Sequence, residues 1–389
     1  MERNMIYLDN AATTYPKPEA VYKAMDQANR LYAVNAGRGA YAAAREASAL
    51  IADTKNKIRS LVHADANAAV VFSPSITVAL NQIINGYRWK DGDYIYVSPY
   101  EHNAVARTLN YLSKNNRVYI KELPLVQDTM EIDIPKMKYE FAKEPPAAIF
   151  CTHISNVTGY ILPIKEIFAE SKQYESFNVL DTAQSLGLIE IDVRRESNVD
   201  IIAFTGHKCL YGPFGIGGFI NLSGVILDEF LVGGTGSDSL NLDMPNGNET
   251  KYEAASSNIV AISGLNAALS ELNVSECYDC EIQLTKYLVA KLLTVDGVKL
   301  YIPSEENQHV GIVSFNLDSM KAEEVGLILD QDFGIAVRTG YHCAPYIHKY
   351  LRDEHFLGTV RISISQFSCM TDIDILCDAI VNIARDFNE

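Results

Sequence analysis

The sequence lacks several features that would each point to a different class of protein. Its longest apolar runs fall far short of the ~20 residues that a helix needs to cross a bilayer, so we expect no membrane partner. The first nine residues contain no long apolar segment and no small-residue cleavage site, which predicts a cytoplasmic protein. The sequence also shows no internal repeat and no low-complexity tract.

Positive charge is scarce. With 33 Lys and Arg against 49 Asp and Glu, the formal net charge is −16. This balance argues against nucleic acid as a partner, because binding a phosphate backbone needs a basic face. Cysteine is present in an odd number, seven, and the predicted compartment is reducing, so we expect no disulfide framework. Small molecules or other proteins remain as partners.

A metal site is not expected either. Cys277 and Cys280 form a lone C-x-x-C pair in what reads as a helix, and no second pair follows at metal-ligand spacing. Four further cysteines are expected to be small buried hydrophobic residues: Cys151, Cys209, Cys369 and Cys377.

The length and the element pattern predict two domains. A chain of 389 residues with 48% hydrophobic and 21% charged residues is globular and long enough for a large and a small domain. Short apolar runs alternate with helical stretches, which predicts an α/β domain with a mainly parallel sheet covered on both faces. The expected strands are 69–72, 94–97, 118–121, 147–151, 178–180, 201–204 and 216–220, with helices at 19–31, 41–62 and 76–84.

The pattern changes near residue 262, where we expect a domain boundary, although a helix could run across it. This gives a large domain at 1–262, whose N-terminal segment packs with the small domain, and a small α+β domain at 263–389. A long helical stretch at 263–293 opens the second part. Its other expected elements are strands at 310–315, 334–338 and 359–365, a helix at 321–329, and a helix capped by Thr371 that runs to Arg385.

The stretch 204–218 places a lysine, Lys208, between a strand and a glycine-rich turn. A lysine held at a strand end, with glycines that let a ligand come close, suits a Schiff-base lysine. The alternative is a solvated loop lysine, which is the commoner fate of a lysine.

Polar residues follow three other expected strands: Glu101-His102-Asn103, His153-Ile154-Ser155-Asn156 and Asp181-Thr182-Ala183-Gln184. Open parallel sheets bind ligands beyond the carboxyl ends of their strands, so we expect these groups and Lys208 to converge. Ser73-Pro74-Ser75 stands between a strand and a helix, an arrangement that can bind a phosphate through free N–H groups. An ordinary capped helix is the alternative there.

A second motif is 337–345, Val-Arg-Thr-Gly-Tyr-His-Cys-Ala-Pro, which follows an expected strand of the small domain. Cys343 is the one cysteine of the seven with both an Arg and a His within the five preceding residues in an evident loop. Because neighbouring positive charge favours a thiolate, this pattern predicts a nucleophilic cysteine.

A pyridoxal phosphate enzyme needs a lysine that holds the aldehyde as an imine and a carboxylate that keeps the pyridine nitrogen protonated. It also needs an aromatic side chain that stacks on the ring and hydrogen-bond donors for the phosphate. These residues resemble the class V branch of fold type I pyridoxal phosphate enzymes and, within it, the cysteine desulfurases with the Arg-x-Gly-x-His-Cys-Ala loop. The resemblance runs from Asp9-Asn10-Ala11-Ala12 to Arg361, nearly the whole chain. It implies the fold type I transferase architecture, a large domain with a mainly parallel seven-stranded sheet and a smaller α+β C-terminal domain.

The resemblance implies a role for each candidate residue. Lys208 would hold pyridoxal 5′-phosphate as an imine, Asp181 would pair with the pyridine nitrogen, and Gln184 would reach the ring hydroxyl. Further cofactor contacts, with His102 stacked on the ring, are implied for His102, Asn156, Ile76, Thr77, Thr205, His207 and, toward the partner subunit, Ser256. Substrate binding is implied for Arg361, which would hold the carboxylate by two bonds, and for Asn35.

Three departures from the family pattern stand out. The phosphate turn reads Ser75-Ile76-Thr77-Val78 where the family usually has Gly-Thr-Thr or Gly-Ala-Thr. Ser256 replaces a threonine that reaches the partner's cofactor, and Tyr341 precedes His342-Cys343 where the family has a second histidine. These changes keep cofactor binding expected but leave its strength open.

The function that the resemblance implies is a homodimeric cysteine desulfurase, which removes sulfur from L-cysteine to give alanine and a persulfide on Cys343. A persulfide-accepting protein is a possible partner. Selenocysteine lyase and class V aminotransferase are the alternatives among enzymes. A pyridoxal phosphate-binding protein for sulfur relay or regulation is the non-enzymatic one, favoured by the altered turn at Ser75-Ile76.

Overall fold

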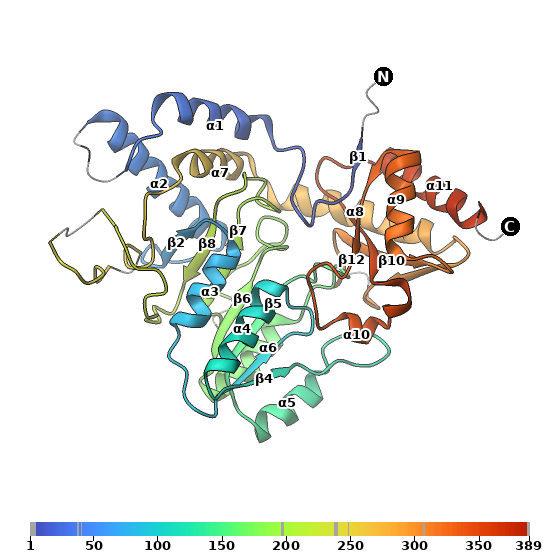
Figure 1. Ribbon diagram of the computed structural model, residues 1–389, viewed down its shortest axis with the longest axis horizontal. Helices are drawn as coiled ribbons and strands as arrows, with labels where there is room; N and C mark the ends of the chain where they lie inside the picture. Colours follow the sequence, from blue (N-terminus) through green and yellow to red (C-terminus); the bar gives the residue numbers. More distant parts are fainter. Residues whose placement is uncertain are drawn as a thin grey trace.

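The computed structural model describes residues 5–386 except 37, 38, 40, 196, 197, 237–239, 248, 306 and 307. Two sheets with their own helices lie next to each other, a seven-stranded sheet from the first two thirds of the chain and a four-stranded sheet near the C-terminus (Figure 1). No helix among the described residues is long and apolar enough to cross a membrane.

The larger sheet is mainly parallel, as predicted. Its strands lie in the order β2-β8-β7-β6-β5-β3-β4, and only β8 runs antiparallel to its neighbours. The bounds are β2 Ala69–Ser73, β3 Tyr94–Val97, β4 Tyr119–Glu122, β5 Pro146–Thr152, β6 Phe177–Asp181, β7 Ile201–Thr205 and β8 Gly217–Asn221. All seven predicted strands are therefore confirmed to within two residues at either end.

Helices cover both faces of this sheet because its central strands are apolar on both sides. On β7, Ile201 and Ala203 join the core under α3 (Ile76–Gly86) and α4 (Asn103–Asn115). Ile202 and Phe204 point to the opposite core, which four other helices cover. These are α2 (Ala42–Leu61), α5 (Ile134–Lys143), α6 (Ile164–Ser171) and α7 (Ile259–Glu271), with α1 (Glu19–Leu31) packed on α7.

The smaller sheet is antiparallel, in the order β12-β13-β10-β9. Its strands are β9 Val298–Tyr301, β10 Ile312–Leu317, β12 Arg338–Gly340 and β13 Thr359–Ser363. One core joins it to α8 (Val274–Leu292), α9 (Ala322–Phe333) and α11 (Met370–Asp386), and α10 (His348–Leu351) lies after β12. The N-terminal strand β1 (Ile6–Tyr7) pairs with β11 (Ile335–Ala336), so the start of the chain lies against the C-terminal part.

Several sequence predictions in the C-terminal part were wrong in detail. The helical stretch 263–293 is two helices, because the chain breaks at Leu272 and the Asn273 side chain caps α8. The expected strand 334–338 is divided between β11 and β12, which belong to different sheets. The last helix begins at Met370, so Thr371 lies inside it and does not cap it. Strand β9 was not predicted.

Helix α7 spans residue 262 and leads from the larger to the smaller sheet (Figure 1). A domain boundary near that residue stays a prediction.

Candidate active site

Lys208 lies in the turn after β7, at the carboxyl edge of the larger sheet. The N-terminal segment fixes this turn from outside: Thr14 N–H, Thr13 Oγ1 and Lys17 Nζ all donate to the His207 carbonyl, at 3.1, 3.0 and 2.7 Å. Burial lowers the pKa of the Lys208 amine, and the negative charge of Asp181 acts against that shift. A lysine whose amine is more easily deprotonated is a better nucleophile.

Asp181 ends β6 and is buried. Its Oδ1 accepts the Ala183 N–H at 2.8 Å. Burial raises the pKa of Asp181, while that bond and the Lys208 charge oppose the rise. The neighbouring Gln184 donates from Nε2 to the Ala11 carbonyl at 2.9 Å, so its amide is tied to the N-terminal segment.

His102 caps α4, with Nδ1 accepting the Ala104 N–H at 3.0 Å. Burial, and after it the positive charges of Lys208, Arg338 and Arg361, lower the pKa of His102 to about 4. The imidazole is therefore neutral near pH 7, as a ring that stacks on another aromatic ring should be.

Glu101, directly before His102, is fully buried. Its Oε1 accepts the Ser98 hydroxyl at 2.5 Å and the Thr152 N–H at 2.6 Å, which joins the ends of β3 and β5. Burial, with the nearby Asp181, raises the pKa of Glu101 well above its usual range.

The part of the site predicted to bind the phosphate lies where the start of β8 meets the N-terminus of α3. Ser75 caps α3 through its side chain, and Ile76 is the first helical residue. A Cβ on Gly217 would come within 2.9 Å of the Ile76 nitrogen, so only glycine fits beside this turn. Two buried polar atoms, Thr205 Oγ1 and His207 Nδ1, have no partner among the described residues. Thr77 is exposed on the first turn of the helix.

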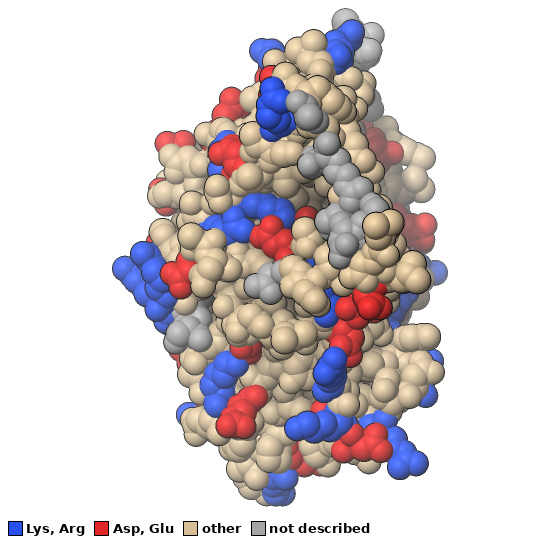
Figure 2. All heavy atoms as spheres, turned by 90° about the vertical axis from the view of Figure 1, so that its left-hand side faces the viewer, with Lys and Arg blue, Asp and Glu red and all other residues tan. Residues whose placement is uncertain are grey.

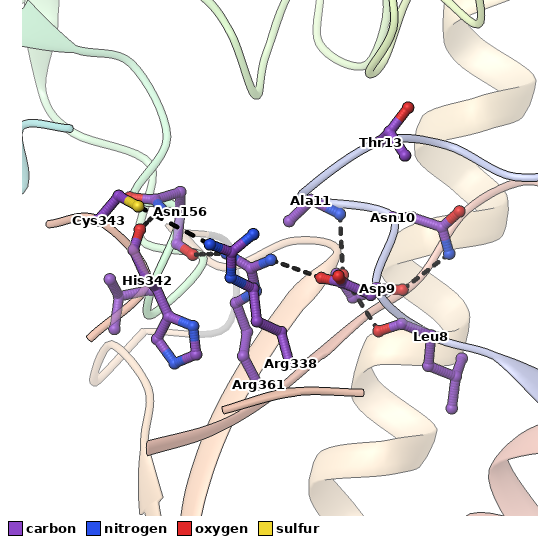
Figure 3. Close-up of polar contacts among 12 residues, drawn as sticks. Leu8, Asp9, Asn10, Ala11, Thr13, Asn156, Arg338, His342, Cys343 and Arg361 are labelled. Carbon is purple, nitrogen blue, oxygen red and sulfur yellow. Dashed lines mark hydrogen bonds and ion pairs between the residues drawn. The ribbon is translucent and has the colours of Figure 1, made fainter. Parts of the chain in front are cut away.

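Cys343 follows β12 in a turn where both His342 and Cys343 have left-handed backbone, with φ of 47° and 58°. The turn is bonded to the larger sheet's loops: the Asn103 N–H donates to the Cys343 carbonyl at 2.7 Å, and Asn156 Nδ2 donates to the His342 carbonyl at 2.8 Å. Cys343 Sγ and Asn156 thus lie on one side of two arginines (Figure 3). Arg338 Nη2 lies 3.7 Å from the sulfur.

Arg361 lies on β13 and is 1% exposed. Its Nη1 donates to the Asn156 carbonyl at 3.0 Å and its Nη2 to Asp9 Oδ1 at 2.7 Å. The buried Nε has no partner among the described residues. The structure therefore brings together His102, Asn156, Asp181, Lys208, Cys343 and Arg361, through direct bonds or through the mutual charge effects given above.

Ser256 and Asn35 lie elsewhere. Both are exposed and line a surface pocket of about 600 Å³ between the segments 231–236 and 250–257. This pocket shares no lining residue with the group around Lys208. In one copy of the chain, these two predicted residues are not brought to the site.

The other cysteines agree with expectation in part. Cys151 and Cys377 are buried and Cys209 is partly buried, but Cys369 is exposed, so its assignment as a buried hydrophobic residue was wrong. It lies just before α11, outside the helix's apolar face. Among the described residues, no cluster of three or more His, Cys, Asp or Glu could hold a metal ion.

Sequence reasoning missed Asp9 and Arg338 as site residues. Arg338 had a signal, because it belongs to the motif that ends on Cys343. Asp9 belongs to the segment where the resemblance begins, but nothing in the sequence indicated its pairing with Arg361, which lies 352 residues away in the chain.

Comparison with known proteins agrees with this geometry. Residues 6–376 match the aminotransferase class-V family, whose members depend on pyridoxal phosphate. A probable cysteine desulfurase of Methanothermobacter thermautotrophicus is 31% identical, over 98% of this chain and 95% of that protein. One of Halalkalibacterium halodurans is 32% identical, over 96% and 91%. The apo cysteine desulfurase of Thermococcus onnurineus NA1 superposes with a TM-score of 0.88 at 26% identity, covering 98% of this chain and 95% of that one. The chain therefore belongs to the class-V aminotransferase family, among relatives that are cysteine desulfurases, and is an enzyme.

Proposed function

We propose that this enzyme is a pyridoxal phosphate-dependent cysteine desulfurase, which converts L-cysteine to L-alanine and leaves the sulfur as a persulfide on Cys343. One observation carries the proposal. The turn that holds the Cys343 thiol is bonded to Asn103, at the start of α4, and to Asn156, after β5, so this turn lies at the edge of the larger sheet that bears Lys208. An aminotransferase has no need of a thiol there.

The residues present fit the cofactor. Thr205 Oγ1 and His207 Nδ1 are buried polar atoms that lack a partner among the described residues, and phosphate oxygens would satisfy them. The N-terminus of α3, with Ile76 and Thr77, adds backbone donors next to a glycine that leaves no room for a side chain. The neutral imidazole of His102 suits stacking on the cofactor ring.

When bound, pyridoxal phosphate supplies an electron-withdrawing ring that stabilises negative charge at the substrate Cα. Asp181 would hold the ring nitrogen protonated, Gln184 would donate to the ring hydroxyl and Asn156 would contact the ring. Lys208 would hold the cofactor and then, freed by the substrate amine, carry the Cα proton; the lowered pKa of its amine suits a base.

Arg361 would bind the substrate carboxylate through the donors that its protein partners leave free. Cys343 Sγ would attack the substrate sulfur: a sulfur–sulfur bond forms, the Cβ–S bond breaks, and the carbon skeleton takes up protons and leaves as alanine. Arg338 presents a positive charge to the attacking sulfur. A reducing compartment such as the cytoplasm suits a free catalytic thiol, and a persulfide-accepting protein would then take the sulfur.

A homodimer is part of the proposal. Six large apolar side chains among the described residues 226–242 are exposed: Ile226, Phe230, Leu231, Val232, Leu240 and Leu242. Figure 2 views this side of the molecule, where charged groups are scattered between larger uncharged areas. Ser256 and Asn35 line the pocket beside this segment, where they could complete the site of a second copy. A cofactor-loaded enzyme that sediments as a monomer would contradict the dimer.

Product analysis tests the reaction. The purified enzyme with L-cysteine should release alanine and, with a reductant, sulfide in equal amounts; L-selenocysteine in parallel measures the preference for sulfur over selenium. A keto acid in place of alanine would identify an aminotransferase. Alanine and selenide from L-selenocysteine alone would identify a selenocysteine lyase.

A further inference from the structure

The turn that carries Cys343, residues 341–344, has a backbone conformation that its side chains disfavour. The Ala344 N–H closes it by donating to the Tyr341 carbonyl at 2.9 Å, and His342 and Cys343 between them both have left-handed backbone. This is the φ pattern of a type I′ turn, whose central positions glycine, asparagine and aspartate normally occupy. Other residues persist in such a conformation only where the surrounding structure holds them. The turn therefore depends on bonds from outside it.

Three successive carbonyls of the turn 341–344 accept such bonds. The loops of the larger sheet supply two of them, from the Asn103 N–H and from Asn156 Nδ2, as described above. The third bond is made by His348, the first residue of α10, whose Nε2 lies 2.9 Å from the Tyr341 carbonyl. Because a carbonyl can only accept, the His348 ring carries a proton on Nε2 and donates it there. His348 thus bonds the same carbonyl that closes the turn.

A buried carboxylate fixes the His348 ring from its other side. Asp353 is fully buried, and its Oδ2 lies 2.5 Å from His348 Nδ1. The bond at one ring nitrogen sets the proton and the direction of the other nitrogen. The Tyr341 ring packs at right angles to the imidazole, with 5.0 Å between the ring centroids. The ring cannot turn away from the Tyr341 carbonyl without losing its bond to Asp353.

We propose that His348 is a positioning residue: its bond to the Tyr341 carbonyl holds the turn 341–344 in the conformation that aims the Cys343 thiol. In that conformation Cys343 Sγ lies 3.7 Å from Arg338 Nη2 (Figure 3). Misplacing a reacting group by about 1 Å can cost on the order of 10²-fold in rate, so a relaxed turn would slow sulfur transfer. The inference rests on the proposed function for the step that it serves, the attack of Cys343 on the substrate sulfur.

The test removes the donor without leaving a buried carboxylate unpaired. Asp353→Asn is the reference variant, because an asparagine amide can donate to Nδ1 while the neutral ring still donates from Nε2. Added to this reference, His348→Leu removes the donor and His348→Gln keeps one. His348→Leu should slow alanine formation in the first turnover of L-cysteine roughly tenfold or more relative to the reference, and His348→Gln should recover most of that loss. His63→Leu, which removes a histidine paired with Glu190 before β2, should match the wild type.

Two further measurements separate positioning from general damage. The dissociation constant of L-alanine, measured from the cofactor absorbance, should stay unchanged in the variant with His348→Leu, because binding this product needs no thiol. Hydrogen exchange of the peptide that contains Ala344 should become faster in the same variant, because the Ala344 N–H closes the turn.

The inference is overturned by an unchanged rate of alanine formation, by equal losses for His348→Leu and His348→Gln, by unchanged exchange at Ala344, or by an L-alanine affinity that falls in step with the rate. If the wild-type enzyme released no alanine from L-cysteine, the proposed function would fail. Exchange at Ala344 would then still decide whether His348 holds the turn.

Discussion

The two sheets contribute to the site in different ways. The larger sheet supplies Asp181 and Lys208 at or just after the ends of neighbouring parallel strands, where the connectivity of the chain brings them to one edge. The smaller sheet supplies Arg338 and Arg361 from within antiparallel strands and Cys343 from a left-handed turn. Those three depend on bonds from distant segments. Strand ends thus place one half of the site, with the N-terminal segment bonded to the turn of Lys208, and long-range contacts place the other half.

The two halves also differ in charge. The larger sheet's edge buries groups that lose their charge on burial, among them Glu101, His102 and His153. The smaller sheet brings two arginines, which remain charged at any pH that an enzyme meets. The difference indicates separate roles. Groups that hold and exchange protons lie on the larger sheet, and fixed positive charge for the substrate and the thiol lies on the smaller sheet.

The largest effect is expected from Lys208→Ala on the larger sheet. This amine both holds the cofactor and carries a proton, and loss of a positioned general base alone costs roughly 10²–10⁴-fold in rate. Alanine production from L-cysteine should therefore fall below detection, while thermal unfolding still shows a folded protein. Borohydride should no longer fix the cofactor covalently to the variant. The exposed Lys165→Ala is the matched control, and cofactor fixed to another lysine would refute the assignment.

A smaller and more selective loss is expected from Cys343→Ser on the smaller sheet. Substrate should still bind and change the cofactor's colour, because those steps depend on Lys208, Asp181 and Arg361. Sulfide release should fall by roughly 10²–10⁴-fold, since a hydroxyl is far less ionised than a thiol near neutral pH.

The exposed Cys369 offers the control, because Cys369→Ser removes an accessible thiol away from the site. If Cys343→Ser kept full sulfide production, the persulfide mechanism would be excluded. An aminotransferase would then have to release sulfide by a route that does not use Cys343.

The same contrast explains what the sequence could predict. Most strands of the larger sheet were predicted because they are short apolar runs buried on both faces, whereas the edge strand β4 reads Tyr-Ile-Lys-Glu and is only partly buried. Strand β9 was missed because Val298–Tyr301 holds only four residues, of which Lys299 is exposed and Val298 and Leu300 are only partly buried, so no apolar run marks it. The break at Leu272 was missed because apolar residues continue through it, and only the Asn273 cap marks the new helix.

The site residues of the two sheets also differ in how well the sequence predicted them. The strand-end residues were found because they follow apolar runs directly, and Cys343 because its motif is compact. Asp9 follows the first short strand, but nothing near it in the sequence indicates that it pairs with Arg361. Ser256 and Asn35 could be assigned only by resemblance, and one copy of the chain does not bring them to the site.

The smallest effect is expected for stability against acid, and on the larger sheet it comes from three histidines. Burial lowers the pKa of His102 and His153 to about 4 and that of His207 to about 3. Below a pH of about 6.5 the unfolded chain protonates these histidines while the folded chain does not. At these histidines the unfolded state then binds more protons, so their contribution to the free energy of unfolding should decrease as pH falls from about 6.5 toward 4. The raised pKa of Glu101 gives a contribution of the opposite sign.

His153→Gln isolates one such group, because His153 is buried and its Nδ1 has no partner among the described residues. Urea unfolding of the cofactor-loaded variant between pH 7.5 and 4.5 should show a shallower decline than the wild type. At pH 5.5 the difference should be about 1 kcal/mol, since one pKa unit corresponds to 1.36 kcal/mol. The exposed His355→Gln should follow the wild-type curve. Equal slopes for His153→Gln and the wild type would mean that His153 is already protonated in the folded enzyme, and the contrast in charge between the two halves would lose one of its supports.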